Sequence, residues 1–242
     1  MKTSTLIVIL FAVIWSSTTS AQSFSQTEEE RIKALALEAI LEQPEVLRQA
    51  IEILQRRDEE AQLAVAQETL TRRRDELERD PNAPVIGNPD GDVTIVEFFD
   101  YNCPYCKRAA EAIDPLLESD KGVRLIYHEW PILGEASVFA ARAALAARLQ
   151  GKYAEMHVAL MRQRRVTEQS TLQAAADIGL DVERLQIDMS APEIDRHIEL
   201  SMSLARDLGF SGMPSFVIGE HLVPGLVPLQ RLEELVALVR AE

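Results

Sequence analysis

The chain has 242 residues, enough for one sizeable domain with an accessory element. Its hydrophobic fraction of 47% and aromatic fraction of 5% are ordinary for a soluble, helix-rich protein. The formal net charge of −14 argues against a nucleic-acid partner bound through its phosphates, and it names no other partner.

The first 21 residues have the pattern of a cleaved secretory signal peptide. Lys2 supplies a positive charge, an uninterrupted apolar run extends from Leu6 to Trp15, and small residues at positions 19–21 offer a cleavage site. Because the apolar run is too short to span a bilayer, a retained membrane anchor is the weaker alternative. We therefore predict that the mature protein is exported and periplasmic.

Residues 22–81 are predicted to form a helical arm. The sequence TEEE at positions 27–30 has the form of a capping box, and helical spacing of apolar residues follows it. After a break at Pro44, a second helix is expected to run to about Arg79, a length of roughly 50 Å.

The apolar side chains of this arm are concentrated at its front, and the charged stretches after position 55 are expected to be solvated. The apolar positions are Ile32, Leu35, Ile40, Leu47, Ile51 and Leu54. A long helix with so short a stripe cannot form its own core, so it packs on copies of itself or along its own catalytic domain. We favour self-association into a homo-oligomer, as a trimer or a dimer.

Residues 82–242 are predicted to form an α/β domain with a helical insertion at about residues 135–209. The pattern predicts strands at 93–99, 123–128, 216–218 and 221–223, and helices at 104–117 and 228–240. The sequence VTIVEFF at 93–99 is apolar on both faces, as in a central strand covered on both sides. The order strand, helix, strand indicates a βαβ unit.

The only two cysteines, Cys103 and Cys106, follow the strand at 93–99 directly. In an oxidising compartment disulfides usually serve structure. A bridge across so small a loop would restrict the unfolded chain very little, so it would add little stability. The pair is therefore interpreted as a reactive dithiol.

Cys103 is placed at the first turn of a helix that follows a central strand. Unpaired backbone N–H groups and the helix dipole favour the thiolate there, which lowers the pKa of the Cys103 thiol. Pro104 suits this turn, where its missing N–H is not needed. Cys106 is close enough to resolve a mixed disulfide and too enclosed to be attacked first. We predict that Cys103 attacks the disulfide of a substrate and that Cys106 then resolves the mixed disulfide and releases the substrate.

A second candidate feature precedes the strand at 216–218. In the sequence GMPS at 212–215, Pro214 is permitted as the first residue of a strand, and a cis bond there would be a retained feature. Such a turn can present the backbone of Met213 as an edge for an extended peptide, which gives main-chain recognition without sequence specificity.

The sequence EFFDYNCPYC before a helix, the helical insertion, GMPSFVIG and a final helix resemble the DsbA family of thioredoxin-fold proteins. The helical arm resembles the ScsC-like subgroup, related to suppression of copper sensitivity. The resemblance implies a thioredoxin-like fold and a thiol:disulfide oxidoreductase, either oxidase or isomerase. It also implies cysteine-containing protein substrates, a membrane redox partner and no cofactor.

The same resemblance assigns roles to single residues. Cys103 would be the nucleophile, Cys106 the resolving thiol and Pro214 the cis-proline. The candidate substrate-binding residues are Met213, Pro104 and Tyr105. Relatives often carry Thr or Val before the cis-proline, whereas this chain has Met213, whose thioether is soft and flexible. The resemblance therefore leaves the reduction potential and the choice of substrate open. The thioether adds at most a weak metal ligand.

Glu97 matches the buried acid beneath the active site in this family. Independently, a carboxylate inside VTIVEFF is expected to have a pKa raised by desolvation. A raised pKa would suit a proton relay for Cys106. The alternative is a partly exposed strand residue without a role in the chemistry.

The histidines show no ligand spacing to one another or to the cysteines, so no metal site is predicted. His128, at the end of the second predicted strand, can lie near the dithiol, but a surface role is favoured. The alternative function is a metal-handling protein that holds copper(I) between the two thiolates, since soft thiolates select this ion.

Overall fold

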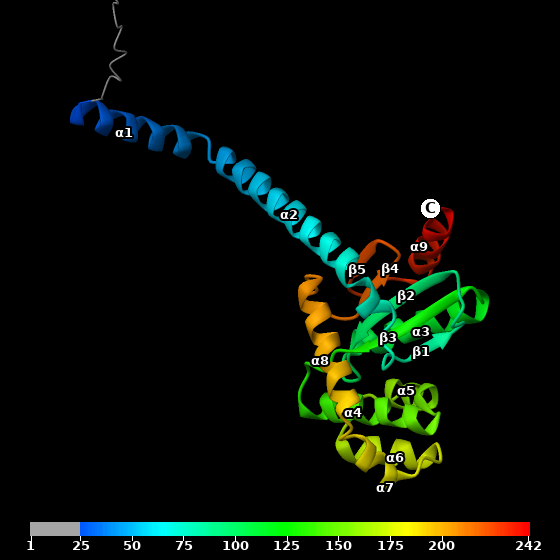
Figure 1. Ribbon diagram of the computed structural model, residues 1–242. Coiled ribbons are helices and arrows are strands. Elements are labelled where there is room, and N and C mark those ends of the chain that lie inside the picture. The colour runs from blue at the N-terminus through cyan, green and yellow to red at the C-terminus, as the bar shows by residue number, and fades with distance from the viewer. Residues whose placement is uncertain (1–24) are drawn as a thin grey trace, which may run out of the picture. The chain divides into compact units, whose positions relative to one another are not determined.

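The computed structural model describes residues 25–242, so the predicted signal peptide at 1–21 lies outside the described residues. The chain separates into two compact units that divide between Arg57 and Asp58. Figure 1 shows the helices and strands in chain order.

The first unit contains helix α1 (Gln26–Glu42) and the front of helix α2 (Glu45–Glu78). The capping box forms two positions earlier than expected: the backbone N–H of Glu28 donates to the Ser25 hydroxyl, and the Glu28 carboxylate accepts from the N–H of Ser25. No side chain of α1 is buried. The predicted apolar stripe is exposed on the single chain, at Ile32, Leu35, Ile40, Leu47, Ile51 and Leu54.

The back of α2 belongs to the second unit. The expectation that its charged stretches are solvated holds for residues 56–62, which are exposed, but not for Leu77, which is buried. The buried residues of α2 are Ala66, Thr69, Leu70 and Leu77. Leu70 and Leu77 pack in one cluster with Phe98 of the central strand. These residues form a second apolar face in a different register from the front stripe, so a pattern that starts at Leu47 does not reach them. The compact unit therefore begins at Asp58 and not at residue 82.

Charged residues of α2 also bind this unit. Arg73 pairs with Asp207 at 2.5 Å and donates to the Ser203 hydroxyl at 2.8 Å. Arg74 forms an ion pair with Glu220. The arginine-rich stretch at the back of α2 is thus a docking face as well as a polar surface.

The second unit is built on a five-stranded mixed sheet in the order β1-β3-β2-β4-β5. Its strands are β1 (Val85–Gly87), β2 (Val93–Phe99), β3 (Val123–Glu129), β4 (Ser215–Ile218) and β5 (His221–Pro224). β2 and β3 are parallel, whereas β4 is antiparallel to β2 and forms a hairpin with β5. The predicted α/β class and the four predicted strands are confirmed. β1 was not predicted, because three residues carry no periodic signal.

Both faces of β2 are covered, as its apolar sequence predicts. Ile95 and Phe99 belong to the core cluster that includes residues of α3 (Pro104–Ser119) and α9 (Leu229–Ala241). Val96 and Phe98 belong to the other cluster, with the back of α2 and the end of α8 (Pro192–Asp207). A helix that starts in the arm therefore seals one face of the strand that leads to the dithiol.

The predicted helical insertion lies between β3 and β4. It contains α4 (Glu135–Ala147), a 3₁₀ turn (Arg148–Gln150), α5 (Tyr153–Met161), α6 (Glu168–Asp177), α7 (Val182–Asp188) and α8. Figure 1 shows α4 to α7 gathered below the sheet. The buried alanines of α4 let its neighbours approach closely, since a methyl group takes little space.

Leu70→Ala should lower the free energy of unfolding of the full chain by about 2–5 kcal/mol, because it leaves a cavity against Phe98. Denaturation followed by the fluorescence of Trp130, which lies in the same cluster, measures this change. Leu63→Ala is the matched control: Leu63 lies on the same helix, is 55% exposed, and should cost less than about 0.5 kcal/mol. Equal costs for the two variants would contradict the packing of α2 in this unit.

Candidate functional site

The dithiol lies at the junction of β2 and α3. Cys103 is the N-cap residue of α3, with φ −77° and ψ 118°, and Pro104 is the first helical residue. The backbone N–H of Cys106 donates to the Cys103 sulfur at 3.4 Å. A sulfur thus fills the capping position where a side-chain oxygen is usual.

This environment lowers the pKa of Cys103 to about 6. The largest contribution is a hydrogen bond from the Cys106 thiol, to which the backbone N–H groups of Cys106 and Tyr105 add. Partial burial opposes the shift. At neutral pH the thiolate is therefore the main form of Cys103, and the thiolate is the nucleophilic form.

Cys106 has the opposite character. Both cysteines are buried, but for Cys106 burial, followed by the hydrogen bond to Cys103, raises the pKa of the thiol. Both cysteines are free thiols. The two sulfurs are therefore unequal in the direction that the predicted roles require.

The turn before β4 lies beside the dithiol, and its Met213–Pro214 peptide bond is cis. The carbonyl oxygen of Met213 lies 3.6 Å from the Cys103 sulfur, across 110 positions of sequence, and accepts a hydrogen bond from it when Cys103 is a protonated thiol. The N–H of Gly225 donates to the Pro214 carbonyl at 2.8 Å, which ties the turn to the residues after β5. Two segments far apart in the chain thus meet at one sulfur.

The remaining candidate contacts lie on the open side of the helix start. Pro104 and Tyr105 are both exposed, and Met213 is half-buried. All three are therefore accessible to a bound polypeptide near Cys103, as the sequence reasoning expected of substrate contacts.

Glu97 lies in the core near the dithiol, and the alternative of a partly exposed strand residue was wrong. Its side chain is 1% exposed. Burial, and then the charge of Cys103, raise its pKa well above the usual carboxyl value. Within residues 25–242, its Oε1 atom has no hydrogen-bond partner. A neutral carboxyl with a free oxygen near two thiols is suited to proton transfer.

Two residues that the sequence reasoning did not single out hold the active-site loop. Asp100 accepts the N–H of Asn102 at 2.7 Å and that of Leu133 at 3.0 Å. Asn102 accepts the N–H of Val166 at 2.8 Å and donates to its carbonyl at 3.2 Å. The only local signal was a pair of polar residues directly after a buried strand, in FFDYNC.

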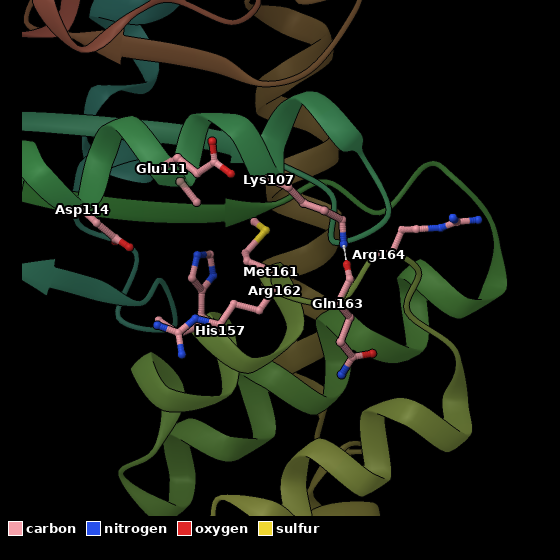
Figure 2. A pocket seen from close by; sticks show the side chains of 10 residues that line it. Lys107, Glu111, Asp114, His157, Met161, Arg162, Gln163 and Arg164 are labelled. Carbon is pink, nitrogen blue, oxygen red and sulfur yellow. Dashed lines mark hydrogen bonds between the residues drawn. The ribbon is translucent and has the colours of Figure 1, made fainter.

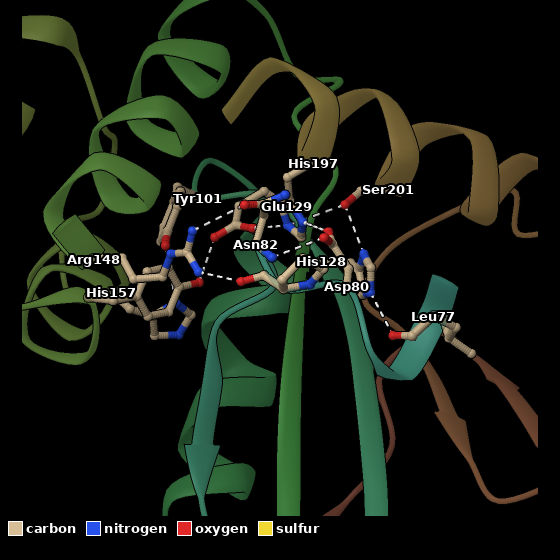
Figure 3. Close-up of polar contacts among 12 residues, drawn as sticks. Leu77, Asp80, Asn82, Tyr101, His128, Glu129, Arg148, His157, His197 and Ser201 are labelled. Atoms are coloured by element: carbon tan, nitrogen blue, oxygen red, sulfur yellow. Dashed lines mark hydrogen bonds and ion pairs between the residues drawn. The ribbon is translucent and has the colours of Figure 1, made fainter. Parts of the chain in front are cut away.

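His128 is fully buried, so the favoured surface role was wrong. Its Nδ1 lies 2.9 Å from the Ser201 hydroxyl and its Nε2 lies 2.9 Å from the Leu77 carbonyl oxygen (Figure 3). Burial, and then the charge of His197, lower its pKa to about 3, so the ring is neutral. One of its partners comes from the back of α2, which the sequence pattern left as solvated surface.

His197 joins Asp80, the second residue after α2, to Glu129 at the end of β3 (Figure 3). Its two ring nitrogens lie 2.6 Å from the Asp80 carboxylate and 2.9 Å from the Glu129 carboxylate. Burial lowers its pKa, but the hydrogen bonds with the two carboxylates outweigh burial and raise it to about 9. Its contribution to stability is therefore complete below about pH 6.5 and is lost as the pH rises through about 9.

Within residues 25–242, no group of three or more His, Cys, Asp or Glu side chains is arranged to hold a metal ion. Over the same range, no helix combines the length and the apolar character needed to cross a membrane. The copper(I) hypothesis needs both sulfurs as thiolates, and the raised pKa of Cys106 opposes this.

Paired thiols at a helix start, beside a cis-proline turn on a mixed sheet with a helical insertion, define a thioredoxin-fold thiol:disulfide oxidoreductase. Residues 94–237 match the family described as DSBA-like thioredoxin domain. The chain belongs to this family, and the resemblance found in its motifs is confirmed.

Solved structures of similar proteins agree with this assignment. A thioredoxin-like oxidoreductase from Silicibacter pomeroyi is 57% identical with a TM-score of 0.69, over 70% of this chain and 98% of that chain. A linker-deletion mutant of ScsC from Proteus mirabilis is 28% identical with a TM-score of 0.70, over 92% of this chain and 99% of that chain. The second match supports the ScsC-like assignment.

Curated relatives match through a part of their length. The Na(+)/H(+) antiporter NhaA 3 of Salinispora tropica is 30% identical over 143 residues, which are 57% of this chain and 22% of that protein. The chain thus spans about a fifth of the length of the curated relatives that it matches first.

Alkylation of the reduced protein should separate the two thiols. Cys103 should react with iodoacetamide along a titration curve with its midpoint at about pH 6, since only the thiolate reacts. Cys106 should stay unmodified at neutral pH, because burial raises its pKa. Mass spectrometry of the two sites measures both reactions. Faster modification of Cys106 would mean that the roles are reversed.

Glu97→Gln should slow the release of a mixed disulfide by about 10²-fold, because Cys106 must lose a proton to attack and the amide cannot accept it. Stopped-flow decay of a mixed disulfide at Cys103, from pH 5 to 8, measures the step. The fold should persist, since the change keeps the size of a buried side chain. Glu111→Gln, at an exposed position on α3, is the control. Equal rates for the two variants across this range would leave Glu97 with a structural role only.

Proposed function

We propose that the protein catalyses thiol–disulfide exchange on the cysteines of folding secreted proteins, in the periplasm. The observation that carries this proposal is the contrast between Cys103, with a pKa of about 6, and buried Cys106, with a raised pKa. The signal-like N-terminal pattern supports export. The family resemblance supports a membrane redox partner that returns the dithiol to its working state.

The site can perform the exchange in two balanced steps. The Cys103 thiolate attacks one sulfur of a substrate disulfide, which forms a mixed disulfide and releases the other substrate sulfur as a thiolate. Cys106 then loses its proton, to Glu97 in our proposal, and attacks the Cys103 sulfur. The second substrate thiolate leaves, so the substrate is reduced and the Cys103–Cys106 pair is oxidised. The reverse sequence oxidises a substrate.

The position of Met213 supports a polypeptide as the substrate. Its carbonyl lies beside the attacking sulfur, and a carbonyl there can accept an N–H from an extended chain. Main-chain recognition suits an enzyme that must accept many sequences. Exposed Pro104 and Tyr105 can then contact the side chains of the bound segment.

The pKa of Cys103 bears on the direction of exchange. The value of about 6 lies between about 7 for thioredoxin and about 3.5 for DsbA. A more stable thiolate makes a better leaving group and a more oxidising dithiol. We therefore propose that the reduction potential of the dithiol lies between those of thioredoxin and DsbA. Such a potential allows the isomerase reaction, in which disulfide bonds of the substrate are broken and re-formed.

Refolding of scrambled ribonuclease and reduction of insulin, run side by side, test the proposed reaction. Cys103→Ala should abolish both activities, because no thiolate remains at the helix start. Cys106→Ala should keep the first attack and accumulate mixed disulfides with the substrate, visible on a non-reducing gel. Activity of Cys103→Ala would overturn the proposal. Isomerase and reductase activity with weak net oxidation would show that the protein acts as an isomerase and not as an oxidase.

We further propose that the front of the arm joins copies of the chain into a trimer or a dimer. The exposure of its apolar stripe supports this, since helices of this length gain most of their stability by packing an apolar face. Several active sites around one substrate raise the effective concentration of thiols there, which favours isomerisation.

The full chain should therefore be an oligomer by light scattering. Leu47→Gln combined with Ile51→Gln and Leu54→Gln should give a monomer with unchanged alkylation of Cys103 and a loss of isomerase activity. Leu63→Gln, at an equally exposed leucine of α2 in the second unit, is the control and should stay oligomeric. If the full chain is a monomer, the result would favour the hypothesis that the protein is an oxidase. The test uses substitutions because removal of residues 22–81 would also remove buried Leu70 and Leu77.

A further inference from the structure

The loop between α5 and α6 carries a cluster of positive charge. Arg162, Arg164 and Arg165 fall within four residues, whereas the whole chain has a net charge of −14. Arg164 and Arg165 are exposed, and neither forms an ion pair with a carboxylate in residues 25–242. Arg162 and Arg164 also line a second cavity, together with Glu111 and Asp114 (Figure 2).

This loop is held at both ends by residues that flank the dithiol. Asn102, directly before Cys103, binds both backbone groups of Val166 at 2.8 and 3.2 Å. Lys107, one turn after Cys103, donates to the carbonyl of Gln163 (Figure 2). The backbone of the two arginines between these attachment points is therefore held next to the active site. When a ligand binds, the side chains have to be ordered but the loop does not.

The two arginines border a hollow that opens beside the nucleophile. The hollow has a volume of about 550 Å³ and is lined by Asn102, Pro104, Leu133, Gly134, Glu135, Ala136, Arg164 and Arg165. Leu133 is 51% exposed, so the hollow offers apolar surface as well as charge. In Figure 2 the Arg164 side chain extends away from the other labelled residues, and its guanidinium has no partner there.

We propose that this hollow, which we call the arginine hollow, binds an acidic segment of the substrate polypeptide that adjoins its reacting cysteine. The inference rests on the proposed function and names the class of substrate. Carboxylates of the substrate pair with Arg164 and Arg165, whose planar guanidinium groups match carboxylate geometry. Apolar side chains of the same segment cover Leu133 and Pro104.

We choose an acidic segment as the ligand of the arginine hollow because its charge complements that of the two arginines. The net charge of −14 disfavours the approach of an acidic polypeptide, so an exposed positive pair beside Cys103 favours its approach there. Glu135 is the one carboxylate among the lining residues, which leaves two cations against one anion in the hollow. The arginine hollow thus favours acidic segments over neutral or basic ones at the reacting sulfur.

Two disulfide-bearing peptides test the proposal on the full chain. They share one cysteine, joined to a neutral small thiol, and differ only in Glu and Asp residues replaced by Gln and Asn. The measured quantity is the second-order rate constant for attack by Cys103. Arg164→Gln combined with Arg165→Gln should slow the acidic peptide by about fivefold, as expected for two partly exposed ion pairs, and leave the neutral peptide unchanged. Raising the salt concentration to about 0.5 M should remove the difference.

A matched control removes the same two charges elsewhere. Arg72→Gln combined with Arg196→Gln changes two exposed arginines of α2 and α8, and it should leave both peptide rates unchanged. An equal loss in this control, or equal slowing of both peptides by the loop variant, would overturn the proposal. An arginine-dependent rate with glutathione disulfide but not with the acidic peptide would also overturn it, in favour of a small anionic thiol. Failure of the neutral peptide to react with the wild type would contradict the proposed function instead.

Discussion

The site depends on the hydrogen bonds that Cys106 donates to the sulfur of Cys103, from its thiol and from its backbone N–H. The N–H bond caps α3 with a sulfur, so the start of the helix and part of the activation of the nucleophile are one structural event. When Cys103 enters a disulfide, its charge disappears and the helix start loses its anionic acceptor. The reduced form is favoured to that extent, which gives the dithiol oxidising power. The same contact also keeps Cys106 within reach of the sulfur it must attack.

This arrangement needs a rigid platform, and β2 provides it because both of its faces are sealed. α3 and α9 cover the face of Ile95 and Phe99, while the back of α2 and α8 cover the face of Val96 and Phe98. The helix that begins in the arm is therefore part of the core that positions the nucleophile. The loop of Arg164 and Arg165 is built in the same way, since residues on either side of the dithiol hold it.

Features with local signals could be predicted from the sequence. Three such signals each lie within a few residues of sequence: the apolar run of β2, the spacing of Cys103 and Cys106, and the Met213–Pro214 turn. Each short stretch was enough to predict the structure that it forms. The sequence reasoning also identified Glu97, because a carboxylate within an apolar strand is conspicuous.

The rest depends on contacts between distant residues. His128 is held by hydrogen bonds with Leu77 and Ser201, which lie 51 and 73 positions away. The sequence around His128 therefore gives no sign of either contact. The buried face of α2 carries few apolar residues, one of its buried positions being Thr69, so its periodicity is weak. Asn102 looked like an ordinary loop residue, since its partner Val166 lies 64 positions away.

The bridge from Asp80 through His197 to Glu129 has a consequence for how the sequence can change over evolution. Loss of the histidine alone leaves two buried carboxylates without a counter-charge, and loss of either acid alone leaves an imidazolium less well paired. Replacement of all three by apolar residues of similar volume removes the charges together and can be nearly neutral. These positions, from three separate segments, therefore form one inherited unit, and relatives should either keep the set or replace it as a whole.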